Sequence, residues 1–241
     1  MDATKAQTIL NKIVKQIFGY DNPLDLEQFK EKFAFDVRLP KAVTDIQDNR
    51  VTWTSTTNPE KYTKFENLTV NDTETEGILA KQAIDTIDDV IGFWEKVNVR
   101  ATERKIDSTN IAESDGVVEC VNIYHSQDIG TSSNILFSDG MSDCEFLAAS
   151  QRCRLSSFCI RLEDSIESSN SFGISCCSKI VRSFMMHSCY DMQDSMFCTG
   201  LTGRRYCIAN MQFEKDEYLK IKEMVLQWIL PQTPQKEDAH G

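Results

Sequence analysis

The chain lacks any apolar run of the roughly 18 residues that a membrane-spanning helix needs. It also lacks a run of lysines and arginines, and its net charge is −11. An acidic chain is a poor match for nucleic-acid phosphates or an anionic membrane, so we expect neither as its main partner. Residues 1–18 are polar and amphipathic, unlike a secretion signal, which predicts a cytoplasmic location.

Motifs that carry chemistry are missing as well. The sequence contains no glycine-rich phosphate loop, no Gly-x-Ser-x-Gly elbow and no Cys-x-x-Cys pair. The nine cysteines are an odd count, which argues against a full disulfide framework. One candidate zinc set fits no structural zinc spacing: Cys176, Cys177, Cys189 and His187. We therefore predict reduced thiols that fill a core, no catalytic, cofactor-binding or metal-binding residues, and no cofactor.

Composition changes near residue 115, where serine, cysteine, methionine and phenylalanine become abundant. Before that point, an apolar stripe over residues 9–18 predicts a helix. A second helix is expected at Leu26–Phe33, a strand around Val51–Thr54 and a further amphipathic helix over residues 84–94. Residues 1–110 are thus predicted to form a small α+β domain.

The second part carries a six-residue repeat. Every sixth position is apolar or cysteine: Ile111, Val117, Ile123, Ile129, Ile135, Met141, Leu147, Cys153 and Cys159. The positions midway between them are all serine or cysteine: Ser114, Cys120, Ser126, Ser132, Ser138, Cys144, Ser150 and Ser156. After Cys159 we expect a slip of one residue, with inward positions resuming at Ile166, Ser169, Phe172 and Ser175, and a second slip before Ile180.

A period of three or six belongs neither to an ordinary strand nor to an α-helix. It fits a chain that coils so that every third side chain points into a thin interior. Asn110, Asn122 and Asn134 recur at intervals of twelve, which sets a coil of about twelve residues and about seven coils. The predicted fold class is mainly β: a narrow β-solenoid preceded by a small α+β domain and capped by a C-terminal helix.

The boundaries follow from these patterns. Residues 111–213 form the predicted solenoid, and residues 214–230 form a helix that caps it, because an open solenoid end exposes strand edges. Tyr218, Ile221, Val225 and Trp228 supply the apolar stripe of that helix. Residues 231–241 are predicted to be a flexible tail.

Two resemblances accompany the repeat. The twelve-residue Ser/Cys coil resembles the beetle antifreeze β-helices in architecture, but it lacks their Thr-x-Thr array, so ice binding is not implied. The segment from Phe197-Cys-Thr-Gly-Leu201 through Tyr206-Cys-Ile208 to Asn210 resembles the ending of uncharacterised Cys/Ser-rich repeat β-solenoid proteins of candidate-phylum bacteria and large bacteriophages. That resemblance covers about residues 117–230 and implies a bacterial or phage setting but no activity.

Histidines offer one enzymatic interpretation. His125 or His187 could be the general base of a trimeric hexapeptide-type acyltransferase, whose coils also repeat every six residues. Such enzymes place a small residue directly after the apolar one, and glycine is scarce here. A third hypothesis is a small-ligand-binding protein with a pocket between domains or subunits.

Phenylalanines recur on the outside of the predicted coils. Phe146, Phe158, Phe184 and Phe197 would form a lateral apolar strip. Such a strip either binds a partner or packs under another part of the same chain. We favour a non-enzymatic structural or protein-interaction module, self-associating or binding a protein partner through this strip, as an oligomer or part of a larger assembly such as a phage virion.

Overall fold

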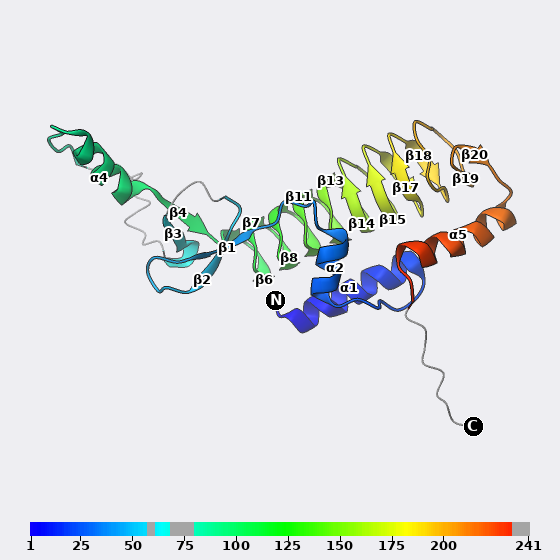
Figure 1. Cartoon of the computed structure of the whole chain (residues 1–241), viewed down its shortest axis with the longest axis horizontal. Helices are drawn as coiled ribbons and strands as arrows, with labels where there is room; N and C mark the ends of the chain where they lie inside the picture. Colours follow the sequence, from blue (N-terminus) through cyan, green and yellow to red (C-terminus); the bar gives the residue numbers. More distant parts are fainter. Residues whose placement is uncertain (57–60, 68–79, 233–241) are drawn as a thin grey trace, which may run out of the picture.

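The computed structural model describes residues 1–56, 61–67 and 80–232. Most of the predicted tail, residues 233–241, lies outside that range. The fold is mainly β, and its largest element is the predicted solenoid of about seven turns with about twelve residues each. The row of strands from β5 (Lys105–Ile106) onward forms one long rod (Figure 1).

Short strands separated by corners build the solenoid. They are β6 (Thr109–Ala112), β7 (Asp115–Val118), β8 (Val121–Tyr124), β9 (Gln127–Gly130), β10 (Ser133–Leu136), β11 (Asp139–Ser142), β12 (Glu145–Ala148), β13 (Gln151–Arg154), β14 (Ser157–Glu163), β15 (Ser169–Ser175), β16 (Ser178–Val181), β17 (Phe184–His187) and β18 (Tyr190–Gln193). Each pairs in parallel with the strand one coil away, so that Ile111 lies beside Ile123 and Ile123 beside Ile135.

The two predicted slips are wrong. Cys159 pairs with Ser171 and Leu162 with Ile174, so the register of twelve continues unbroken. Ser165 and Ser168 are buried, whereas Ile166 is exposed. What changes is the order of sizes: Cys159 and Leu162 are consecutive inward residues, and this moves the large positions by one triplet without moving the frame.

Backbone conformation explains the three-residue period. Every third residue from Asp107 to Tyr206 has a left-handed φ, between 44° and 71°. Each of them directly precedes an inward residue, so the chain turns after every triplet. Asparagine tolerates this region better than most residues, and Asn110, Asn122 and Asn134 all occupy it. Asn122 Nδ2 also donates to Asn134 Oδ1 at 2.8 Å, one coil away.

The inward serines and cysteines bond successive coils. Ser126 Oγ donates to the Tyr124 carbonyl at 2.8 Å and accepts the Ser138 amide at 3.0 Å. Ser138 and Ser150 repeat the arrangement. Cysteine takes the same place: Cys120 Sγ accepts the amide of Ser132 at 3.4 Å. These bonds offset the cost of burying hydroxyls and corner amides in an otherwise apolar interior.

A second core lies outside the coils. One outward column recurs every twelve residues and is apolar throughout: Tyr124, Leu136, Ala148, Ile160, Phe172, Phe184, Met196 and Ile208. Three helices cover it: α1 (Ala3–Phe18), α2 (Leu26–Phe33) and α5 (Lys215–Ile229). They lie along one side of the rod (Figure 1). α1 buries the predicted stripe, including Leu10 and Ile13. Helix α5, the predicted C-terminal helix, buries Tyr218, Leu226 and Ile229, whereas Trp228 of the predicted stripe is exposed.

The remaining elements sit at the two ends. At the start of the rod lie β1 (Lys41–Thr44), β2 (Val51–Thr54), β3 (Lys61–Lys64), η1 (Phe65–Asn67), α4 (Ile87–Val97) and β4 (Val99–Thr102). At its other end, β19 (Cys207–Ile208) and β20 (Met211–Gln212) form a hairpin. Packing therefore divides the chain differently from the predicted domains 1–110 and 111–213, because α1 and α2 share a core with the solenoid.

Candidate functional site

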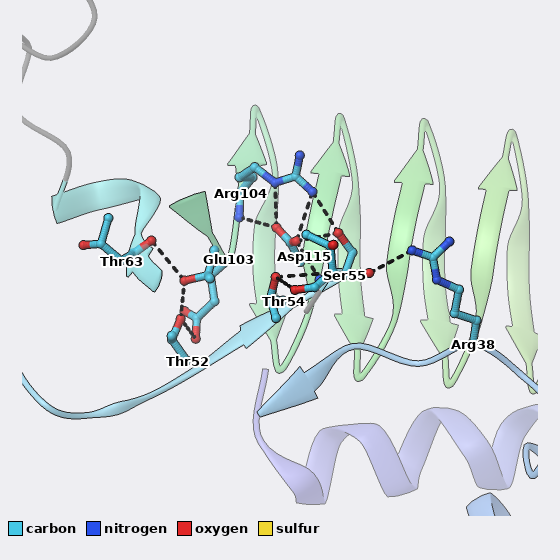
Figure 2. Close-up of polar contacts among 10 residues, drawn as sticks. Arg38, Thr52, Thr54, Ser55, Thr63, Glu103, Arg104 and Asp115 are labelled. Carbon is cyan, nitrogen blue, oxygen red and sulfur yellow. Dashed lines mark hydrogen bonds and ion pairs between the residues drawn. The ribbon is translucent and has the colours of Figure 1, made fainter. Parts of the chain in front are cut away.

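A buried ion pair joins β2 to the first coils. Asp115 is fully buried on β7. Its carboxylate accepts from the Arg104 amide at 3.0 Å, from Arg104 Nε at 2.9 Å and from Nη2 at 3.0 Å. Ser55 adds its amide at 2.9 Å and its hydroxyl at 2.8 Å (Figure 2). No sequence pattern predicts this cluster, since nothing local distinguishes Asp115 from an exposed acid.

The electrostatics of Asp115 indicate a structural role. Burial alone would raise the pKa of its carboxyl, but the hydrogen bonds from Arg104 and Ser55 outweigh burial and hold the pKa below its ordinary value. Five donors saturate the carboxylate oxygens. A general base needs a free lone pair aimed at substrate, so this cluster serves as a joint between the N-terminal strands and the rod.

A hydroxyl network extends this joint. Thr52 Oγ1 and Thr102 Oγ1 are 2.6 Å apart, and Thr102 donates to the Thr63 carbonyl at 3.1 Å. Arg38 Nη2 reaches the Ser55 carbonyl at 2.8 Å from the segment beside the rod (Figure 2). These bonds connect β2, β3 and β4 to one another.

His125 is enclosed by other side chains. Its Nδ1 lies 2.8 Å from Glu113 Oε2, and its ring packs edge-on against Trp53 with centroids 4.8 Å apart. Only 9% of His125 is exposed. A carboxylate on Nδ1 does orient a histidine as a base, but this ring is closed to an acceptor substrate. His187 is exposed on β17, and the structure gives its ring no carboxylate partner within the described residues.

The side chains of the candidate zinc set point to opposite sides of the solenoid backbone, some into its interior and some to the outside. Cys177 and Cys189 are inward neighbours, with the Cys189 amide 3.2 Å from Cys177 Sγ, whereas Cys176 and His187 face outward. The backbone of the solenoid therefore separates the members of the candidate zinc set from one another. Within residues 1–56, 61–67 and 80–232, no group of three or more His, Cys, Asp or Glu side chains could hold a metal ion.

The predicted aromatic strip is largely internal. Phe184 is fully buried and Phe146 nearly so, because α1 and α5 lie over them. Lys12 of α1 places Nζ 3.9 Å from the Phe146 ring centroid, and Phe146 stacks on Phe158 at 4.6 Å. Phe197 keeps 38% of its surface and lies beside Trp228. A strip exposed at all four residues is thus wrong, because Phe146 and Phe184 pack under the chain's own helices.

Helix α4 presents an exposed apolar face. Thr86 caps its start through a capping box with Asp89, so the helix is well specified locally. It buries no residue, although its sequence is strongly amphipathic. Five large apolar side chains are exposed along it: Ile87, Val90, Ile91, Trp94 and Val97. The helix projects from the end of the molecule, away from the rod (Figure 1).

Two of the hollows beside the lateral helices are large enough for a ligand or side chains. One, of about 590 Å³, lies between the starts of α1 and α2 beside Tyr124. Its charged groups are Asp25 and Glu27, so it offers no cation to an anionic ligand. The other, of about 550 Å³, lies between the end of α1 and α5 and contains Lys222.

No protein-family model, no curated protein and no solved structure matches the chain. Among the described helices, none combines the length and apolar character that a membrane crossing requires.

Proposed function

We propose that this protein is a non-enzymatic structural or protein-interaction module, in which a rigid solenoid carries α4 as its contact element. The supporting observation is the exposure of α4: Ile87 is 70% and Trp94 57% exposed. A contiguous apolar face of this kind is unfavourable in water, and it is typical of a surface that docks into a groove.

The solenoid rod is suited to act as a rigid spacer. Its coils bond to their neighbours throughout, and its lateral apolar column is covered by α1, α2 and α5. The buried carboxylate of Asp115 and the half-buried carboxylate of Glu113 are held by partners within the chain. A phage particle or a bacterial cytoplasmic assembly is the proposed setting, supported by the resemblance of residues 117–230 to repeat proteins from those sources.

Photo-crosslinking tests the proposal. A benzoylphenylalanine at Ile91 of the full chain, expressed in its native host, should give discrete protein adducts, either with a second copy or with another protein. A peptide of residues 80–100 should compete them away. The same probe at Lys179, exposed on the rod, is the matched control. Equal labelling from both positions, or no adduct from position 91, would overturn the assignment of α4 as the contact element.

A further inference from the structure

The groove between α1 and α5 has an apolar floor and one cation. Phe18, Tyr20, Leu219 and Leu226 line it together with Lys222, and Glu223 stands on its exposed rim. Leu219 keeps 42% of its surface exposed. At about 550 Å³, the groove falls within the size range of sites that accept large side chains or ligands.

Lys222 is an incompletely satisfied charge. Its Nζ lies 5.3 Å from the centroid of the Phe184 ring, and burial lowers the pKa of its ammonium group. Among the described residues, no carboxylate lies within ion-pair distance of it. A partly desolvated ammonium in an apolar groove is stabilised by an incoming carboxylate.

Helix α4 offers the complementary surface. Asp88 and Glu95 are seven residues apart and therefore lie on the same side of the helix, next to the apolar face. Glu95 is loosely paired with Lys61 at 3.9 Å, whereas Asp88 forms no ion pair with any described residue. An apolar helix with an acidic edge matches an apolar groove that contains a lysine.

We propose that α4 of one copy docks into the α1–α5 groove of a second copy, with Asp88 facing Lys222. This inference rests on the proposed function and names its partner. The two surfaces are different, so the contact is head-to-tail and generates open chains of rods or rings. Helix α4 and the groove helices lie in separate parts of the molecule, so one copy can use both surfaces at once (Figure 1).

Single-surface variants test this geometry by sedimentation velocity over a concentration series. The full wild-type chain should form concentration-dependent oligomers. Trp94→Gln removes the helix anchor and Leu219→Glu blocks the groove, and each should weaken assembly at least about tenfold. An equimolar mixture of the two should regain dimers, because one intact helix and one intact groove remain. Met224→Gln, which changes an exposed residue of α5 outside the groove lining, should leave assembly unchanged.

Charge reversal provides a second test. Lys222→Glu should abolish assembly and the double variant Asp88→Lys, Lys222→Glu should restore it, while circular dichroism confirms the fold of each. A wild-type chain that stays monomeric, or oligomers that persist in Leu219→Glu, would overturn the second copy as partner. Adducts from position 91 to a different protein would then keep the proposed function while rejecting this inference.

Discussion

Inward serine is specified by backbone chemistry as well as by size. At corners such as Ser138, the inward hydroxyl donates to the carbonyl two residues earlier, that of Leu136, and accepts the amide of Ser150 from the next coil. Cysteine can do both more weakly, and alanine can do neither. The Ser/Cys alternation in the sequence therefore records hydrogen bonding, not merely space for a small side chain.

Ser138→Ala should lower the free energy of unfolding by about 2 kcal/mol, because it leaves the buried Ser150 amide unpaired and removes the hydroxyl donor from the Leu136 carbonyl, which keeps only the Ala149 amide. Ser138→Cys should cost only about 1 kcal/mol, since a thiol occupies the equivalent place at Cys120. Urea denaturation monitored by circular dichroism measures both. Ser188→Ala, at an exposed position, is the control and should stay within about 0.5 kcal/mol of wild type. Equal effects at positions 138 and 188 would refute the hydrogen-bonding role.

At the scale of elements, the repeat made the solenoid predictable because each coil imposes the same environment. The inward residue of each triplet from Ile111 to Cys159 was predicted from the sequence, as were the helices at Leu26–Phe33 and around Ile87. The slips were misjudged because large and small residues exchange places at Leu162 while the backbone period persists.

The lateral helices could also have been anticipated. The column from Tyr124 to Ile208 is apolar at every twelfth residue, and an outward apolar column needs a cover. The joint at Asp115 was not predictable, since Ser55 and Asp115 are 60 residues apart in sequence and meet only after the strands are placed. Contacts between residues that only tertiary packing brings together leave no periodic pattern in the sequence.

The joint should respond to pH. The pKa of Asp115 is lowered in the folded state, so its stabilising contribution is present above the ordinary carboxyl pKa of about 4 and is lost as the pH falls through the lowered value. At neutral pH, Asp115→Asn should reduce the free energy of unfolding by about 2 kcal/mol, because Arg104 loses its partner. The difference in the free energy of unfolding between wild type and Asp115→Asn should stay constant above about pH 5 and shrink below about pH 4.

Urea denaturation of both proteins, repeated at intervals of about one pH unit from about pH 3 to about pH 7, measures this difference in the free energy of unfolding. Asp107→Asn, an exposed change at a left-handed position that asparagine tolerates, controls for the loss of one negative charge. A gap for Asp115→Asn that does not narrow at acid pH would contradict the ionised joint.

Whether the rod unfolds as one unit depends on how its coils are linked to one another. Solenoid coils contact mainly their neighbours, and such chains can open from an end. Here α1 packs across several coils, from β10 to β15, and Tyr20, just after its end, donates its hydroxyl to the Leu226 and Leu230 carbonyls at 2.9 and 2.7 Å. Helices that bridge coils couple their stability, so we expect cooperative unfolding.

Thiol labelling reports this coupling directly. Cys176 is the one exposed cysteine of nine, and the other eight are at most 4% exposed. Burial raises the pKa of Cys153 to about 12 and that of Cys177 to about 11, which suppresses the reactive thiolate further. In native buffer, an aromatic disulfide reagent should therefore modify one thiol quickly, and Cys176→Ser should remove that phase. The remaining eight should react together in a single slow phase, because the lateral helices prevent individual coils from opening. A separate early phase assigned to Cys198 and Cys207 would show instead that the last coils fray independently beneath the β19–β20 hairpin.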